Sequence, residues 1–189
     1  MKPETRKEEI IRVAAKLFKE KGYSAVTMRD LAKAMGIKAA SLYNHINSKQ
    51  DILNAIIINL AEEFTAGMKL VQSSGENCIG KLNRIIELHV RISSQNIYGM
   101  ASLNNDWMHL EEKLDYYQRL RIDYEDDFRA ILKQGITSGE IVDVNPEVMM
   151  FSILTTLRSL YLWIPKKEEL NLEELSNTLN QILIKGINK

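Results

Sequence analysis

TMRDLAKAMGIKAASLYNHI, residues 27–46, holds two short helical patterns separated by a single glycine. Apolar residues in the first half recur at i, i+3, i+4 and i+7, which predicts a helix with one apolar stripe. These residues are Met28, Leu31, Ala32 and Met35. Thr27 and Asp30 have the spacing of a capping box at the start of this helix, and Gly36 can take the positive φ that a sharp turn needs. A second helix is therefore expected soon after Gly36.

Residues 39–46 predict that second helix, with Leu42 and Ile46 facing inward. Ile37 can fill the angle between the two helices. The remaining side chains are small or polar and are expected on the outer surface: Lys38, Ala40, Ser41, Tyr43, Asn44 and His45. Small residues near a helix N-terminus allow close approach to a DNA groove, and polar side chains bond base edges or phosphates. The stretch predicts a DNA-reading helix-turn-helix; the alternative is a buried helix hairpin that does not bind DNA.

The distribution of charge favours a DNA-binding N-terminal part. The whole chain is neutral, with 25 Lys and Arg and 25 Asp and Glu. Residues 1–50, however, carry 11 basic and 5 acidic side chains, a net charge of +6, so the remaining 139 residues carry −6. The basic part coincides with the motif, as expected of a protein that binds the DNA backbone.

About the first 55 residues resemble the TetR family of transcriptional regulators. The matching residues are Ile11, Ala14, Ala15, Leu17, Phe18, Gly22, Tyr23, Thr27, Leu31, Ala32, Gly36, Ile37, Leu42, Tyr43, His45, Lys49 and Leu53. Two positions depart from the family pattern: Lys38 stands where the family usually has a small hydroxyl residue, and Ile46 where it usually has an aromatic one. We interpret Lys38 as a phosphate contact that replaces a helix cap, and Ile46 as a substitution within the core.

The motif and the resemblance together predict which residues contact DNA. Those expected at phosphates are Thr27, Arg29, Lys38, Tyr43, His45 and Lys49, and those expected at bases are Ala39, Ala40, Ser41 and Asn44. Asn44 suits the edge of an adenine. Lys49 lies in the first turn of the next predicted helix, where the helix N-terminus favours a phosphate.

The composition and the motifs argue against several other classes of protein. The 189 residues include 45% hydrophobic residues, three prolines and one cysteine, Cys78, which favours a helical protein without an intrachain disulfide or a cysteine-rich metal site. No signal sequence opens the chain and no apolar run approaches about 18 residues, so we expect a soluble, cytoplasmic protein without a membrane segment. No phosphate-binding glycine loop, HExxH, CxxC or Ser/His/Asp signature occurs. We expect neither an enzyme nor a metal or other cofactor.

Caps and periodicity predict an all-α protein of about nine helices. The clearest ranges are 5–22, 27–35, 39–46, 48 to about 67, 79–92, 107–138, 145–165 and 172–187, with a loop at 72–80 and a short apolar stretch at 97–103. The fourth helix is too long for the DNA-binding end alone. We therefore divide the chain into a helix-turn-helix DNA-binding domain, 1–50, and a helical effector-binding and dimerisation domain, 51–189.

An apolar and aromatic set is spread over helices that surround a ligand cavity in TetR-like proteins. The resemblance implies a ligand-binding role for Phe64, Met68, His89, Ile92, Tyr98, Met100, Leu103, Trp107, Met108 and Tyr117. Methionine and aromatic side chains make an adaptable apolar lining. For any one of these residues taken alone, ordinary core is the better interpretation.

The stretch from Val148 to Trp163 is apolar nearly all round, which a peripheral helix of a monomer cannot satisfy. The resemblance implies a homodimer built on the last two helices. The expected interface residues are Phe151, Leu154, Leu157, Arg158, Tyr161, Leu175, Leu179 and Ile182.

These observations predict a homodimeric repressor that binds a palindromic operator and is released by a small, largely apolar effector. The stretches WMHLEE, RIDYEDDFRAIL and QGITSGEI resemble a branch of the family with acyl-CoA-responsive members, which implies a fatty acyl or acyl-CoA effector. One alternative is a regulator of the same fold without a small effector. Another is a helical lipid-binding protein whose basic end is incidental.

Overall fold

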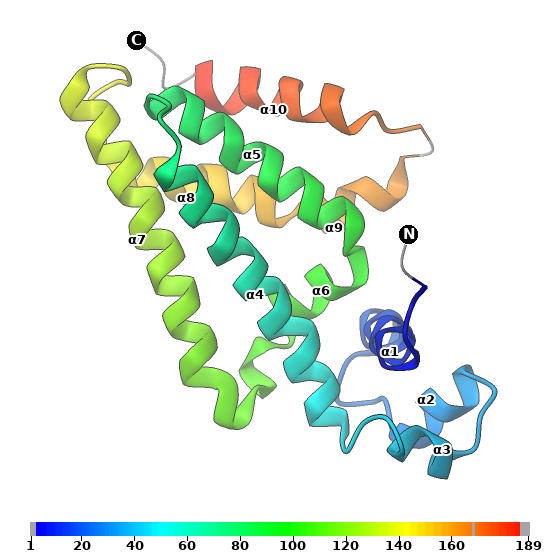
Figure 1. Ribbon diagram of the computed structural model, residues 1–189. Coiled ribbons are helices and arrows are strands. Elements are labelled where there is room, and N and C mark those ends of the chain that lie inside the picture. The colour runs from blue at the N-terminus through cyan, green and yellow to red at the C-terminus, as the bar shows by residue number, and fades with distance from the viewer. Residues whose placement is uncertain (1–2, 168, 186–189) are drawn as a thin grey trace. The chain divides into compact units, whose positions relative to one another are not determined.

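The computed structural model describes residues 3–167 and 169–185, and over these ranges the chain is all-α, as predicted (Figure 1). The helices are α1 (Arg6–Lys21), α2 (Met28–Ala34), α3 (Ala39–Tyr43), α4 (Lys49–Ser73), α5 (Cys78–Gln95), α6 (Ile97–Asn105), α7 (Leu114–Ser138), α8 (Pro146–Arg158), α9 (Leu160–Trp163) and α10 (Leu172–Lys185). Short 3-10 turns lie at Trp107–His109, Glu111–Lys113 and Ile164–Lys166. Because α9 is a single turn that follows α8 after Ser159, these ranges hold nine helices when the two are counted as one, the predicted number.

Side-chain caps mark the helix starts that the sequence predicted. Thr27 Oγ1 accepts a hydrogen bond from the backbone N–H of Asp30 at 3.1 Å, and the Asp30 carboxylate accepts one from the backbone N–H of Thr27 at 2.9 Å. Thr5 and Glu8 make the same reciprocal pair at the start of α1. The Asn145 side chain caps α8, which has a proline in its first turn. Local hydrogen bonding thus fixes the register of these helices.

The helix α4 is longer than predicted, because Gly67 does not end it and the helix continues to Ser73. A Cβ atom added at Gly67 would lie 2.5 Å from Cδ2 of Leu88 on α5. The glycine therefore allows close packing of α4 on α5 rather than a turn. The loop that follows is correspondingly short, since Asn77 already caps α5 by accepting a hydrogen bond from the backbone N–H of Gly80.

Three other boundaries differ from the prediction. The helix expected from Trp107 begins at Leu114, because Glu111 has a φ of +47°, outside the helical region, and the chain before it forms 3-10 turns. The helix expected to end at Pro165 is interrupted at Ser159. The reading helix α3 ends at Tyr43 instead of Ile46. The last predicted helix ends at Lys185, and residues 186–187 of that prediction lie outside the described residues.

The chain forms two compact units. Unit 1 comprises Met1–Ala61 and Tyr98–Tyr117, and unit 2 comprises Glu62–Ile97 and Gln118–Lys189. The helix α4 contributes residues to both units, its first half to unit 1 and its second half to unit 2. The division at residue 50, which was made by function, stays a prediction.

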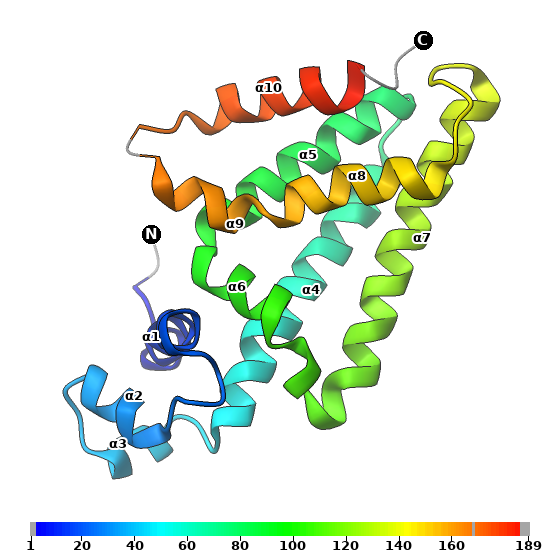
Figure 2. The ribbon, with the colours of Figure 1, turned by 180° about the vertical axis from the view of Figure 1, so that it is seen from behind.

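Each unit has its own buried core. In unit 1, α2 packs against both α1 and α3, and Ile10, Phe18, Leu31 and Leu42 are buried. In unit 2, α5 packs against α10 and also against α8 and α9 (Figure 2). The buried residues of α5 are apolar apart from Lys81, His89 and Ser93, and His89 and Ser93 lie one turn apart.

Among the described residues, one helical stretch, Pro146–Lys166, is long and apolar enough to cross a membrane by length and composition. This corrects the expectation that no apolar run would approach that length, because the stretch remains apolar on average although it contains Glu147 and Arg158. Within the most apolar window of the stretch, 44% is buried inside the protein. One such helix is weak grounds for a membrane segment, since a core helix of a soluble protein has the same properties.

Candidate DNA-binding surface and effector site

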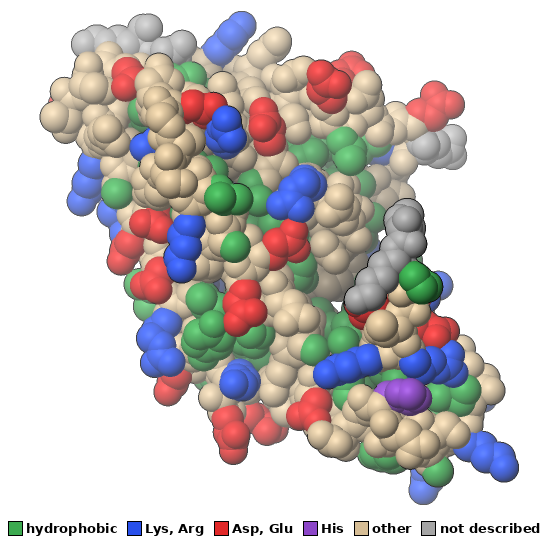
Figure 3. Space-filling view, in the orientation of Figure 1, with side chains coloured by type: hydrophobic (Ala, Val, Ile, Leu, Met, Phe, Trp, Pro, Cys, Tyr) green, Lys and Arg blue, Asp and Glu red, His purple; other side chains and the backbone are tan. Residues whose placement is uncertain are grey.

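The outer face of α2 and α3 carries the predicted DNA-binding residues. Leu31, Ala32 and Leu42 bury the inner faces of these helices. The exposed members of the predicted set are Thr27, Arg29, Lys38, Ala40, Ser41, Tyr43, Asn44 and His45, while Ala39 and Lys49 are half-buried. Lys and Arg side chains gather over the first three helices in the space-filling view (Figure 3). Unit 1 thus presents a polar, basic surface built on short helices.

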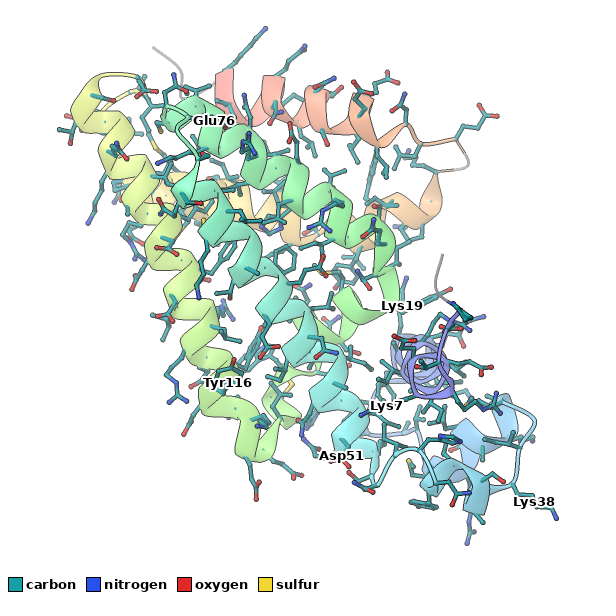
Figure 4. All side chains as sticks on the ribbon, viewed as in Figure 1. Lys7, Lys19, Lys38, Asp51, Glu76 and Tyr116 are labelled. Atoms are coloured by element: carbon teal, nitrogen blue, oxygen red, sulfur yellow. The ribbon has the colours of Figure 1, made fainter. Side chains whose placement is uncertain are left out.

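The turn before α3 differs from an ordinary capped helix start. Gly36 has a φ of +67°, the left-handed conformation that the sequence predicted for it. Lys38 is the N-terminal cap residue of α3 and makes no side-chain capping hydrogen bond. Its side chain points away from the helices (Figure 4). Lys38 therefore leaves the first backbone N–H groups of α3 without a side-chain acceptor and extends its ammonium group toward solvent.

Lys49 has contacts inside unit 1. Its Nζ donates a hydrogen bond to the backbone carbonyl oxygen of Tyr23 at 2.9 Å and lies 4.2 Å from the centre of the Tyr23 ring. These contacts tie the start of α4 to the segment between α1 and α2. An ammonium group has three donors, so a phosphate contact by Lys49 stays a prediction.

A second segment packs on this part of unit 1, and no pattern in the sequence indicated this contact. Tyr23 donates a hydrogen bond from its hydroxyl to Gln50 Oε1 at 2.8 Å, and Gln50 Nε2 donates to the carbonyl oxygen of His109 at 2.7 Å. The rings of Tyr23 and His109 stack with their centres 5.2 Å apart. Burial, together with the charges of Glu111 and Asp106, raises the pKa of Tyr23. The 3-10 segment that contains His109 is thereby fastened beside the first turn of α4.

The predicted ligand-binding residues divide between the two units. Unit 1 holds Tyr98, Met100, Leu103, Trp107, Met108 and Tyr117, and unit 2 holds Phe64, Met68, His89 and Ile92. In unit 1, Met100 and Tyr117 are buried, whereas Met108 is half exposed. The rings of Trp107 and Tyr117 stack with their centres 6.1 Å apart. All four residues in unit 2 are buried.

An aromatic cluster lies inside unit 2, formed by Phe64 of α4, His89 of α5 and Tyr124 of α7. The ring centres of Phe64 and His89 are 4.6 Å apart, and Tyr124 meets both rings edge-on at 6.1 Å and 5.9 Å. His89 Nε2 lies 2.9 Å from the Tyr124 hydroxyl oxygen. Tyr124 was missed from the sequence, although its position four residues before the buried Phe128 places both on one face of α7.

The cluster is uncharged, and an ion pair lies near it. Burial, followed by the nearby charge of Arg158, lowers the pKa of His89 to about 3. Burial also raises the pKa of Tyr124. Arg158 Nη2 donates a hydrogen bond to Glu125 Oε1 at 2.7 Å. Burial by itself would raise the pKa of Glu125, but the hydrogen bonds and charges of Arg158 and Arg121 outweigh it and lower that pKa.

The predicted dimer-interface residues differ in exposure. Phe151 and Ile182 are 69% and 67% exposed. Arg158, Leu175 and Leu179 are half-buried, whereas Leu154, Leu157 and Tyr161 are buried within unit 2. The predicted interface stays a prediction, and hydrophobicity identifies an apolar helix without telling which side the protomer itself covers. The other exposed large apolar residues of these helices are Val148, Leu162, Trp163 and Leu172.

Two family models match this chain and together cover most of it. Residues 10–56 match the model of bacterial regulatory proteins of the tetR family, and residues 75–187 match the tetracyclin repressor-like C-terminal domain. The HTH-type transcriptional repressor KstR2 of Rhodococcus jostii (strain RHA1) is 26% identical over 136 residues, which are 71% of this chain and 67% of that relative.

Solved structures share the fold over nearly the whole chain. The ketosteroid transcriptional regulator KstR2 of Mycobacterium tuberculosis superposes with a TM-score of 0.92 at 21% identity, covering 100% of this chain and 97% of that one. AibR in complex with isovaleryl coenzyme A and operator DNA superposes with a TM-score of 0.77 at 22% identity, covering 94% and 97%. At these identities the likeness shows the fold alone.

Proposed function

Because the chain belongs to the TetR family of bacterial regulatory proteins, whose members are DNA-binding transcriptional regulators and not enzymes, we propose that it is a ligand-responsive repressor. It binds a palindromic operator as a homodimer, and a small, largely apolar effector releases it. The observation that carries the proposal is the exposed face of α2 and α3, where eight of the ten predicted DNA contacts stand in solvent above a buried apolar core.

The DNA contacts divide into two kinds. Thr27, Arg29, Lys38, Tyr43, His45 and Lys49 position the protein on phosphates, and Ala39, Ala40, Ser41 and Asn44 face the bases. Lys38 supports this division, since its ammonium group caps nothing and extends into solvent beside the first turn of α3. Phosphate contacts fix the register on the duplex, and base contacts select the sequence.

A second copy of the chain covers the exposed apolar face of α8, α9 and α10. Phe151 and Ile182, together with Val148, Leu162 and Trp163, expose large apolar side chains on these helices. Large exposed apolar side chains gathered on neighbouring elements are typical of an interface. A twofold axis through such an interface brings two reading helices to successive major grooves, about 34 to 36 Å apart, and makes the operator palindromic.

The effector is a largely apolar molecule, and we favour a fatty acyl or acyl-CoA compound. AibR, which has the same fold, was crystallised with isovaleryl coenzyme A and operator DNA. The buried residues Phe64, Met68 and Ile92 offer apolar and aromatic side chains to such a group. An effector that binds the conformation with low operator affinity better than the DNA-bound one lowers operator binding by that difference in affinity.

Selection from random duplex DNA tests the function. The purified full-length chain should recover a palindromic sequence whose half-sites are about 10 base pairs apart, centre to centre. Native mass spectrometry of protein purified from its host then identifies a co-purifying effector, which should release the selected duplex when added back. Failure to select any palindrome would contradict the proposal, and a protein that selects one but is released by no co-purifying molecule would support a regulator without a small effector.

A further inference from the structure

Two buried polar side chains of α5 lie at the core of unit 2. His89 is 3% exposed and Ser93 is 0% exposed. Their spacing of four residues places them one turn apart on the same face of the helix. Phe64 of α4 and Tyr124 of α7 contact His89, so three helices converge on this point.

Only one of the three polar side-chain atoms of this pair is hydrogen-bonded within the described part of the protein. His89 Nε2 is bonded to the Tyr124 hydroxyl at 2.9 Å. His89 Nδ1 and Ser93 Oγ have no hydrogen-bond partner among the described residues. Nearly all buried polar groups in native proteins are paired, and each specific exception calls for a functional or structural reason. Two exceptions within one turn of a helix indicate a place for a polar group of a bound molecule.

The chemistry of the pair decides what that group must be. A phenol is a stronger donor than an imidazole N–H, and an imidazole nitrogen is a stronger acceptor than a phenol oxygen. Tyr124 therefore donates to His89 Nε2, which leaves the hydrogen of the neutral ring on Nδ1. The low pKa of His89, which burial and the charge of Arg158 produce, keeps the ring neutral at physiological pH. Ser93 offers a second donor from its hydroxyl.

We propose that His89 Nδ1–H and Ser93 Oγ–H form a carbonyl-binding site, in which both donate hydrogen bonds to the oxygen of an uncharged ketone, ester or thioester on a largely apolar molecule. A carbonyl oxygen has two lone pairs and accepts two donors. A carboxylate does not suit the site, because the nearby Arg158 is already paired with Glu125 and a buried anion needs a counter-charge. The site rests on the proposed function, since it names the polar feature of the effector.

Three probes of equal chain length test this specificity by isothermal titration calorimetry on the full-length protein. Methyl decanoate carries a neutral carbonyl, decyl methyl ether lacks it, and decanoate carries a charge. The site predicts that the ester binds about tenfold more tightly than the ether, as two hydrogen bonds allow, and that decanoate binds no better than the ether. Equal binding of ester and ether, binding of none of the three, or preference for decanoate would overturn the carbonyl-binding site.

Two variants assign the preference to the proposed donors. Ser93→Ala removes one hydroxyl without adding volume, and it should weaken ester binding about threefold to tenfold while ether binding stays unchanged. His89→Phe should do the same, and Ser93→Ala decides alone if His89→Phe does not fold. Ser152→Ala on α8, whose hydroxyl is exposed and bonds only its own helix, is the matched control. An ester preference that survives in Ser93→Ala would refute the assignment.

The operator measurements separate this inference from the proposed function. A protein that selects a palindrome and is released equally well by ester and ether keeps the proposed function and loses the carbonyl-binding site. A protein that prefers the ester through Ser93 but selects no DNA keeps the site and loses the proposed function.

Discussion

In unit 1, polar side chains such as Ser41 and Asn44 stand in solvent on short helices whose inner faces are apolar. In unit 2, by contrast, the polar side chains of His89 and Ser93 are buried. An exposed polar group is already hydrogen-bonded to water, so replacing that water by DNA changes the stability of the fold little. An enclosed polar group without a partner lowers stability, so its presence indicates chemistry that packing alone does not require. The exposed set therefore indicates a surface, whereas the enclosed pair indicates a specific ligand group.

The largest effect is expected on the exposed apolar face of unit 2, which is neither an exposed polar surface nor an enclosed polar pair. The double variant Phe151→Asp with Ile182→Asp places charges on that face and should yield monomers by analytical ultracentrifugation. Operator affinity should fall by more than about 100-fold, because the two reading heads then bind separately. Leu70→Asp, on α4 and 72% exposed, is the control and should stay dimeric. A double variant that remains dimeric would place the interface elsewhere.

The interior of unit 2 should make stability depend on pH. His89 has a folded pKa of about 3 against an ordinary value near 6.5, so the unfolded chain binds the extra proton between these values. Stability is therefore complete above pH 6.5 and is lost as the pH falls. The free energy of unfolding should drop by about 2 kcal/mol from pH 7 to pH 5, at about 1.4 kcal/mol per unit. Urea titrations of the parent and His89→Phe at pH 7 and pH 5 test this. An equal change in the free energy of unfolding with pH in both proteins would contradict it.

The same contrast applies to what the sequence could predict. Capping pairs such as Thr27 and Asp30, and the positive φ of Gly36, are local features, and their predictions are confirmed. The interruption before α7 was not predictable, because the positive φ of Glu111 leaves no mark in the residue type. Gly67 was misjudged for a related reason: the sequence shows a glycine, but only the fold shows Leu88 packed against it.

Site prediction had the same limit. Outward-facing residues of α2 and α3 follow from helical spacing around a known apolar stripe, so their exposure was predictable. Leu154 and Leu157 were assigned to the interface, yet they are buried within the protomer, since the side of an apolar helix that faces inward depends on its neighbours in the fold. Tyr124 was missed because its contact with His89 joins residues 35 positions apart.

Two conservative variants compare the enclosed and exposed hydroxyl groups directly. Tyr124→Phe removes the partner of His89 Nε2 and should lower the free energy of unfolding by about 1 to 2 kcal/mol, because a buried polar atom is left unpaired. Tyr43→Phe removes a hydroxyl that stands in solvent and should change stability by less than about 0.5 kcal/mol. Urea unfolding of both variants provides the comparison, and a Tyr124→Phe protein as stable as the parent would mean that the hydrogen bond contributes nothing.

At the exposed face, Asn44→Ala should reduce discrimination at one base pair of the selected operator by about 1 kcal/mol. Stability should be unaffected, because the side chain is exposed and no described hydrogen bond involves it in a structural role. Binding curves with the selected duplex and its three variants at that base pair measure the effect. A uniform loss over all duplexes would move Asn44 from the bases to the phosphates.

The smallest expected effect concerns Lys49, which combines features of both regions because it is half-buried and charged. If its ammonium group contacts a phosphate, Lys49→Ala should lower the slope of log K against log salt by about 0.9, together with a uniform loss over all sequences. If the group only holds the carbonyl oxygen of Tyr23 at 2.9 Å, affinity should fall because the reading helix is misplaced. The slope should not change, because the number of phosphate contacts, and so of released counterions, stays the same. Lys38→Ala is the comparison, since that ammonium group has no capping role, and its removal should reduce both the slope and the affinity without misplacing the reading helix. An unchanged slope in Lys49→Ala beside a reduced one in Lys38→Ala would assign Lys49 to the scaffold and leave Lys38 as the phosphate contact.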